Sequence, residues 1–116
     1  FDGLEGLRLW QPRDPALYRV ALTLTSDAGE DDLSARFGFR EARFTPEGFR
    51  LNGEALKIMG LNRHQSFPYT GYAQGRASQR RDAEILRWDL GCNLARTSHY
   101  PQSRHFLDRC DEIGLL

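Results

Sequence analysis

Two polar clusters, each at the end of a short apolar segment, constrain the fold more than any other feature of this sequence. They are residues 60–64 (GLNRH) and 95–101 (ARTSHYP). Their histidines, His64 and His99, are 35 positions apart, and a helical pattern lies between them. The predicted order is a strand that ends in polar residues, a helix, and a second strand that ends in polar residues. This order is typical of a parallel β/α sheet, in which functional residues lie at the carboxyl ends of strands. The sequence therefore predicts a site at the ends of two neighbouring strands.

The second half of the chain predicts alternating strands and helices. Apolar segments 56–61 and 92–95 are interpreted as the two strands. Between them we expect a long loop and then a helix over 78–90, and after them a second helix over 103–113. Residues 115–116 would open a third strand.

Side-chain chemistry predicts how these two helices begin and which faces they bury. Ser78 is a suitable cap for the first helix, whose residues Ala83, Leu86 and Leu90 share one face. Gly114 is a suitable stop for the second helix. Three acidic residues of the second helix are expected to form its solvated face. They are Asp108, Asp111 and Glu112.

The first third of the chain predicts antiparallel β-structure. Residues 20–25 alternate large apolar with small or polar side chains, which is the period of a half-buried strand. A second strand is expected over 33–40. Residues 45–48 predict a turn, which we take as the domain boundary. The pair at 52–53 (NG) predicts a tight hairpin, because both residues tolerate positive φ. These strands are too few to close a sandwich, so we interpret them as the end of one.

Composition excludes several functional classes. Sixteen basic and sixteen acidic residues cancel, and no basic stripe is present, so we predict no nucleic-acid partner. No apolar run approaches the roughly 20 residues that span a bilayer, so we predict no membrane partner. Cys92 and Cys110 are expected to be small buried hydrophobes, with a disulfide left open. The sequence favours neither a cytoplasmic nor a periplasmic location.

His64 and His99 are the first candidates for chemistry. An imidazole at a strand end can hydrogen-bond a hydroxyl group or transfer a proton near neutral pH. Each histidine alone is more often structural, but two at equivalent strand ends would converge on one side of the sheet. A zinc site would need a third ligand, which His105 inside the second helix does not supply, so we predict no metal.

Arg96 and three tyrosines complete the candidate residues. An arginine beside a buried strand needs a carboxylate partner, which is either Asp82 or Glu84 on the adjacent helix or a residue outside this chain. The tyrosines could stack on a sugar ring or simply pack. They are Tyr69, Tyr72 and Tyr100.

An ordered set of motifs gives these residues a family context. The motifs are residues 9–10 (LW), 37–40 (FGFR), 51–53 (LNG), 60–64 (GLNRH), 96–101 (RTSHYP) and 110–115 (CDEIGL). In this order and spacing the chain resembles glycoside hydrolase family 2, the family of β-galactosidases and β-glucuronidases. The resemblance covers nearly the whole chain.

The resemblance implies an α+β fold built from parts of two domains. Residues 1–44 would be the C-terminal strands of an immunoglobulin-like β-sandwich. Residues 45–116 would be the first β/α units of a (β/α)8 TIM barrel that carries the catalytic site, truncated at strand 3. His64 would then end the first barrel strand, and His99 the second.

The resemblance also implies a function. The chain would be part of a retaining exo-β-glycosidase, β-galactosidase-like, that hydrolyses O-glycosidic bonds of β-linked sugars. Asn62, His64, His99 and Tyr100 would bind the sugar, and Arg96 would support the nucleophilic glutamate and keep it ionised. Both catalytic glutamates would lie outside this chain, so the isolated chain is predicted to be inactive. No cofactor is implied, and a homo-oligomeric parent protein is left open.

Two other functions are alternatives to this one. One is a non-catalytic carbohydrate-binding or scaffold module derived from the same family. The other is a helix-bearing interaction domain with no role toward sugars, and the ordered set of motifs disfavours it. Two incomplete domains would leave open sheet edges and an exposed barrel interior. We therefore expect the isolated chain to be marginally stable.

Overall fold

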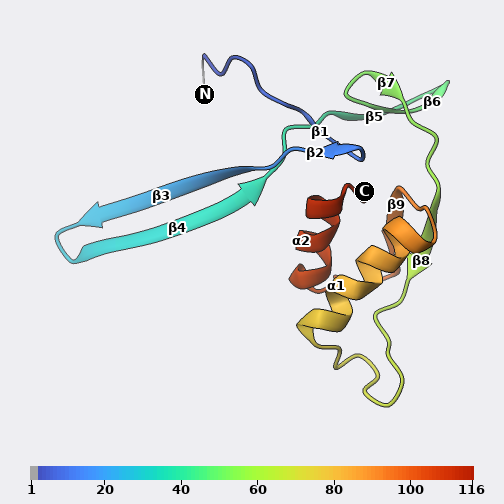
Figure 1. The fold of residues 1–116 in the computed structure, drawn as a ribbon. Helices are drawn as coiled ribbons and strands as arrows, with labels where there is room; N and C mark the ends of the chain where they lie inside the picture. Colours follow the sequence, from blue (N-terminus) through green and yellow to red (C-terminus); the bar gives the residue numbers. More distant parts are fainter. Residues whose placement is uncertain (1–2) are drawn as a thin grey trace.

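An antiparallel β part and a β/α part meet at a pair of packed helices in this chain (Figure 1). The computed structural model describes residues 3–116, so the first two residues of the predicted 1–44 domain lie outside the described residues. Seven strands form the antiparallel part. They are β1 (Trp10–Gln11), β2 (Asp14–Pro15), β3 (Tyr18–Ser26), β4 (Gly29–Phe37), β5 (Ala42–Thr45), β6 (Gly48–Leu51) and β7 (Glu54–Ala55).

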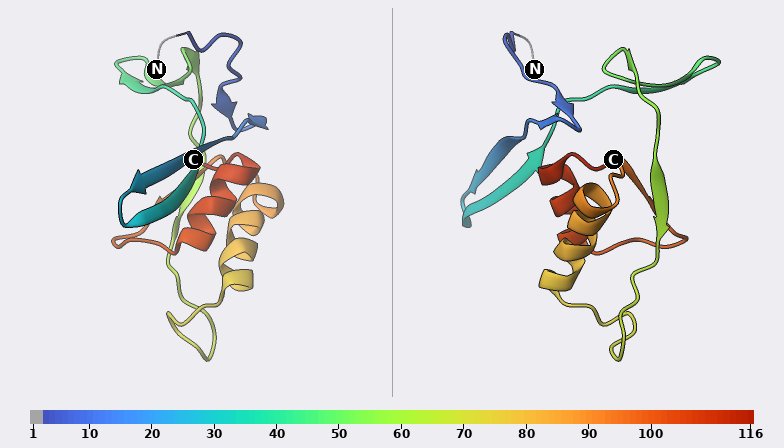
Figure 2. Two further views of the ribbon diagram at one scale, coloured as in Figure 1. Left: turned by 90° about the vertical axis from the view of Figure 1, so that its left-hand side faces the viewer. Right: turned by 45° about the vertical axis from the view of Figure 1, so that its right-hand side comes forward.

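The β3–β4 hairpin projects away from the rest of the molecule (Figures 1 and 2). Its leucines are exposed, with 58% of Leu22, 69% of Leu24 and 66% of Leu33 accessible to solvent. The prediction of a half-buried strand is therefore wrong here, because no second sheet covers this hairpin within residues 3–116. The projection also explains the radius of gyration of 17.2 Å, since a compact chain of this length would measure about 13 Å.

The expected tight hairpin at 52–53 is confirmed, and it joins β6 to β7. Asn52 and Gly53 have φ angles of 53° and 83°, which is the left-handed pair of a type I′ turn. Together β5, β6 and β7 form one three-stranded sheet. The expected domain boundary between residues 44 and 45 falls inside β5, and its position stays a prediction.

One parallel strand pair forms the β/α part. It joins β8 (Gly60–Arg63) to β9 (Leu94–Thr97), and Asn62 is paired with Arg96. Both strands lie further along the chain than predicted, so the polar residues Asn62, Arg63 and Arg96 belong to the strands themselves. Leu116 exchanges backbone hydrogen bonds with the chain around β9, although no third strand forms within the described residues.

Helices connect and follow these two strands. They are α1 (Arg76–Glu84), the π-helical turn η1 (Ile85–Asp89) and α2 (Arg104–Ile113). No helix within residues 3–116 is long and apolar enough to cross a membrane. The α2 helix has the expected stop, Gly114 at a φ of 75°, and the Ser103 side chain accepts a hydrogen bond from the His105 amide at its start.

The first helix departs from its prediction at both ends. It begins at Arg76 after Gly75, with no side-chain cap, so the expected role of Ser78 is wrong. At the other end, the Leu90 amide donates to the Ile85 carbonyl, five residues back. This wider π-helical turn rotates the chain out of the α-helical register. Leu90 is therefore 56% exposed rather than buried beside Ala83 and Leu86.

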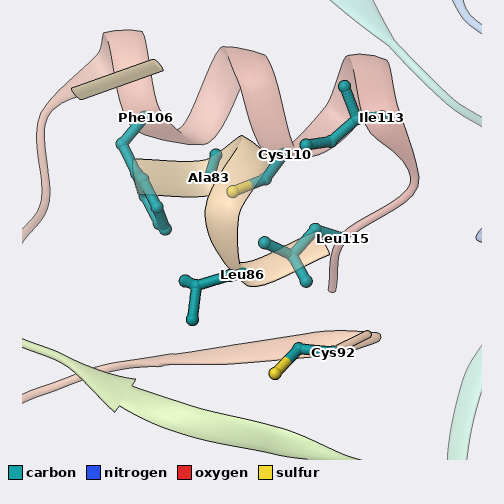
Figure 3. Close-up of a cluster of buried hydrophobic side chains, with 7 residues drawn as sticks. All are labelled: Ala83, Leu86, Cys92, Phe106, Cys110, Ile113 and Leu115. Atoms are coloured by element: carbon teal, nitrogen blue, oxygen red, sulfur yellow. The ribbon is translucent and has the colours of Figure 1, made fainter. Parts of the chain in front are cut away.

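The hydrophobic core lies between the helices and the start of β9 (Figure 3). Its buried side chains are Ala83, Leu86, Cys92, Phe106, Cys110, Ile113 and Leu115. Both cysteines are free and only 6% exposed, which confirms their expected role as buried hydrophobes.

Trp10 joins the antiparallel part to the second helix. Its side chain is completely buried, and its indole N–H donates to the Asp111 carbonyl of α2 at 2.8 Å. Its backbone carbonyl accepts from the Asn52 side chain at 3.0 Å, and its amide donates to the Phe39 carbonyl at 2.8 Å. The Arg40 guanidinium lies 4.5 Å from the indole centre. We refer to Trp10 with Phe39, Arg40, Asn52 and Asp111 as the Trp10 seam.

Candidate functional site

The carboxyl ends of β8 and β9 bring His64 and His99 side by side, as the sequence predicts for neighbouring parallel strands. Their ring centres are 5.6 Å apart in an edge-to-face arrangement, and both side chains are exposed. Tyr100 lies next to them, with its ring 6.4 Å from His64 and 5.8 Å from Tyr72 of the long loop. Tyr69 is fully exposed and contributes no ring contact to this cluster.

Strand alternation separates two sets of side chains at this end of the sheet. Asn62 and Arg96 are register partners, so their side chains lie on the same face, where the Arg96 guanidinium donates to the Asn62 amide oxygen at 3.4 Å. Arg96 is exposed there, and the expected ion pair with Asp82 or Glu84 is not formed. Asp82 binds Arg63 instead, because Arg63 points to the opposite face, toward the helices.

The end of β9 has a strained backbone. His99 has a φ of 65°, in the left-handed region that non-glycine residues rarely adopt. Ser98 before it is completely buried, its amide donates to the Arg63 carbonyl at 3.3 Å, and its hydroxyl has no partner within the described chain. Strain of this kind, of order 1–3 kcal/mol, persists only where the surroundings hold the backbone firmly, and it concentrates at functional sites.

Gln65 links the two strand ends directly. Its amide donates to the Tyr100 hydroxyl at 2.8 Å, and its side-chain oxygen accepts from the Ser103 amide at 3.1 Å. The first residue after His64 therefore holds the segment that follows His99 at two points, Tyr100 and Ser103.

Arg63 was not among the site residues predicted from the sequence. It is only 5% exposed, and its guanidinium contacts the side chains of four polar residues and the ring of Phe106. The polar partners are Gln74, Gln79, Asp82 and Gln102. The available signal was the period of two in β8, which places Arg63 beside Leu61 on the face that packs against helices.

A second charged cluster surrounds Glu112 on α2, where a solvated face was expected. Its carboxylate binds Arg36 of β4 at 2.8 Å, Arg80 of α1 at 2.8 Å and Arg109 at 2.9 Å. Burial alone would raise the pKa of Glu112, but the hydrogen bonds from these arginines outweigh burial and lower the pKa to about 2. This cluster supports the helix pair rather than the strand ends.

Burial has the opposite result at the neighbouring core residue Cys110. Desolvation raises the pKa of its thiol to about 12, with a smaller contribution from Asp111. The thiol therefore stays protonated and unreactive at neutral pH.

Among the described residues, the histidine pair gathers no third side chain that would complete a metal site. Within residues 3–116, no group of three or more His, Cys, Asp or Glu side chains lies close enough to hold a metal ion. His105 lies in α2 rather than beside the pair. The arrangement instead offers two imidazoles, an amide, a phenol and a guanidinium, which together can donate to and accept from a polyhydroxylated ligand.

Fold and site together define a class of protein. Parallel strands with helical crossovers that gather polar side chains at their carboxyl ends are typical of β/α enzymes. The family described as glycosyl hydrolases family 2, TIM barrel domain, matches residues 43–116, and the family described as glycosyl hydrolases family 2 matches residues 3–40. The chain therefore belongs to glycoside hydrolase family 2. The predicted order, the end of a β-sandwich followed by the start of a TIM barrel, is confirmed.

Individual relatives agree with this assignment. The chain is 52% identical over 115 residues to a β-galactosidase of Thermoanaerobacterium thermosulfurigenes, covering 99% of this chain and 16% of that protein. The crystal structure of a β-galacturonidase from Eisenbergiella tayi, bound to galacturonate, has a TM-score of 0.89 and 38% identity, covering 98% of this chain and 20% of that one. The crystal structure of Parabacteroides merdae β-glucuronidase has a TM-score of 0.86 and 36% identity, covering 94% and 14%. The chain thus spans only a small part of the length of each relative.

Proposed function

We propose that this chain is part of a retaining exo-β-glycosidase of the β-galactosidase type, which hydrolyses O-glycosidic bonds of β-linked sugars. The observation that carries the proposal is the pair of exposed rings of His64 and His99, 5.6 Å apart at the ends of two parallel strands. The identity of 52% to a protein named β-galactosidase, against 36% and 38% to the two uronidases, favours a galactoside as the substrate.

Each site residue has a role that suits its chemistry. Asn62, His64 and His99 would hydrogen-bond sugar hydroxyl groups, because amide and neutral imidazole groups both donate and accept. The Tyr100 hydroxyl already accepts from the Gln65 amide, which leaves its proton available for the sugar. Arg96, exposed on the same face as Asn62, would lie beside the nucleophilic carboxylate. A guanidinium in that position lowers the pKa of the carboxyl group and keeps it ionised.

The catalytic carboxylates would come from outside this chain. Retaining glycosidases use two carboxyl groups about 5 Å apart, one as nucleophile and one as acid and base. Strand β8 ends at Arg63 and is followed by His64, and β9 ends at Thr97 and is followed by Ser98, so neither strand end contributes a carboxylate. We therefore expect the chain alone to hydrolyse no glycoside.

Expression of the complete reading frame that contains this chain tests the proposal. We expect turnover of an aryl β-galactoside and, by NMR of the first product, retention of the anomeric configuration. His99→Ala should lower kcat/KM by about 100-fold, since lost hydrogen bonds worth about 3 kcal/mol have that effect. His105→Ala, an exposed histidine on α2, is the matched control and should leave kcat/KM unchanged.

Three results would count against parts of the proposal. Preference for an aryl β-glucuronide would make the galactoside assignment wrong and leave the glycosidase assignment standing. Binding of galactose without any turnover would favour the non-catalytic carbohydrate-binding module. Equal effects of the His99 and His105 substitutions would show that the histidine pair does not bind substrate.

A further inference from the structure

We infer that Arg63 is the positioning residue of this site: its buried guanidinium holds the separate segments that carry the site's aromatic side chains. The structural part of this inference rests on contacts within the chain. Its consequence for substrate affinity rests on the proposed function. Hydrogen exchange therefore tests the structural part, and enzyme kinetics test its consequence for affinity.

Arg63 lies behind the site rather than in it. It is the last residue of β8, between Asn62 and His64, and strand alternation directs its side chain to the face opposite theirs. There it is 5% exposed and lies over the ring of Phe106, with 4.0 Å between the guanidinium carbon and the ring centre. It therefore does not reach a ligand bound on the open face.

The partners of Arg63 come from three segments of the chain. In α1, Nη2 donates to Gln79 and to Asp82, both at 2.7 Å. In the long loop before α1, Nη2 also donates to Gln74 at 3.0 Å. In the loop between β9 and α2, Nη1 donates to the Gln102 side chain. A buried charge is costly unless it is paired and hydrogen-bonded, so the position of Arg63 depends on all of these contacts.

These contacts reach every segment that carries an aromatic side chain of the site. His64 is the next residue along the chain. Gln74 lies two residues after Tyr72, and Gln102 lies two residues after Tyr100. The Arg63 carbonyl accepts from the Ser98 amide, immediately before the strained residue His99. The side chain and the backbone carbonyl of Arg63 thus hold both strand ends and the long loop.

The shape of the guanidinium group, in addition to its charge, suits this role. Arginine presents five donors on a rigid planar fork, whereas the lysine ammonium presents three donors on one nitrogen. Lysine at this position would keep a positive charge near Asp82 but could not reach Gln74 and Gln102 at the same time. Arg63→Lys therefore tests the geometry while it preserves the charge.

Arg87 provides a matched control. It is also an arginine with three hydrogen bonds, two of them to distant parts of the chain, but all three go to backbone carbonyls, those of Ile113, Cys92 and Pro12. None of these partners belongs to the strand ends that carry the site. Arg87→Lys should therefore destabilise the protein without loosening the site.

The experiment is hydrogen exchange with mass spectrometry on the full protein that contains this chain. In Arg63→Lys, peptides covering 64–75 and 98–103 should exchange about tenfold faster, as expected for the loss of hydrogen bonds worth about 1.4 kcal/mol. In Arg87→Lys, faster exchange is expected in peptides covering 91–93 and 113–116 instead. Gln102→Ala, which removes one link only, should speed exchange at 98–103 and keep the protein folded even if the Arg63 variant does not fold.

Activity on the proposed glycoside supplies the second measurement. Arg63→Lys should raise KM by about tenfold, the effect of about 1.4 kcal/mol of lost binding, with a smaller change in kcat. Arg87→Lys should lower Tm and leave KM unchanged. If the wild-type protein shows no turnover, the proposed function fails, but the exchange pattern still decides whether Arg63 holds the strand ends. Equal exchange patterns in the two lysine variants, or an unchanged KM in a protein whose strand ends have loosened, would overturn the inference.

Discussion

Removing the charge of Glu112 should destabilise the packing of the helices by an amount that depends on pH. The carboxylate is 22% exposed and is shared by Arg36, Arg80 and Arg109. Burial would raise its pKa, but the three arginines lower the pKa from its ordinary 4.5 to about 2. At about 1.4 kcal/mol per pH unit, this lowering corresponds to about 3 kcal/mol of stability at pH 7.

The direction of the pH dependence follows from the depressed pKa of the folded state. The contribution of Glu112 is fully present above about pH 4.5 and is lost as the pH falls through about 2. At pH 3 the unfolded carboxyl is mostly protonated while the folded one is mostly ionised, so about 1.4 kcal/mol remains. Glu112→Gln should therefore differ from the wild type by about 3 kcal/mol at pH 7 and by about half of that at pH 3.

Urea unfolding followed by tryptophan fluorescence measures both differences, with Trp10 as the buried reporter. Because the isolated chain is expected to be marginally stable, every sample would contain sucrose at one fixed concentration, which stabilises the folded state. Asp108→Asn is the matched control, because it removes the same charge one turn earlier on α2, and its carboxylate forms no ion pair within residues 3–116. A Glu112→Gln effect no larger than that of the control, or a difference that does not narrow at pH 3, would refute the reasoning.

Three further predictions follow from close contacts and burial. Gly60→Ala should destabilise the β8–β9 pair by more than about 2 kcal/mol in urea unfolding, since a Cβ there would lie 2.2 Å from a carbonyl oxygen of β9. Gly75→Ala, with open space around it, should cost less than about 1 kcal/mol. Trp10→Phe should lower Tm by several degrees through the lost hydrogen bond to α2, whereas the same change at the exposed Trp88 should leave Tm unchanged. Finally, Cys110 should react with a thiol reagent only after the protein unfolds in urea, and rapid reaction of the folded protein would contradict its burial.

Local signals in the sequence were sufficient to predict several features of the fold. The hairpin at 52–53 and the helix stop at Gly114 follow from backbone preferences of the residues themselves, and the start of α2 agrees with the cap at Ser103. The order strand, helix, strand, helix follows from hydrophobic periodicity. The convergence of His64 and His99 then follows from topology, because parallel strands end at the same edge of a sheet.

Features that depend on distant contacts could not be predicted in this way. Asp82 binds Arg63 rather than Arg96 because the two arginines lie on opposite faces of the β8–β9 sheet, which only the exact strand register determines. The π-helical turn that exposes Leu90 has no recognisable signal in its sequence. The exposure of the β3–β4 hairpin depends on what lies against it, which a period-two pattern does not specify.

The Trp10 seam has a consequence for recombination between relatives. A crossover placed near residue 41, between the two segments that match the family, would take Trp10 and Phe39 from one parent and Asn52 and Asp111 from the other. Two of the bonds across that crossover end on backbone carbonyls, which every parent supplies, but the Asn52 side chain and the indole are specific to their parents. Chimeras that inherit both from compatible parents should stay soluble. A library whose crossover sites are chosen by residue number alone, without preserving the Trp10 seam, should contain many chimeras that fail to fold.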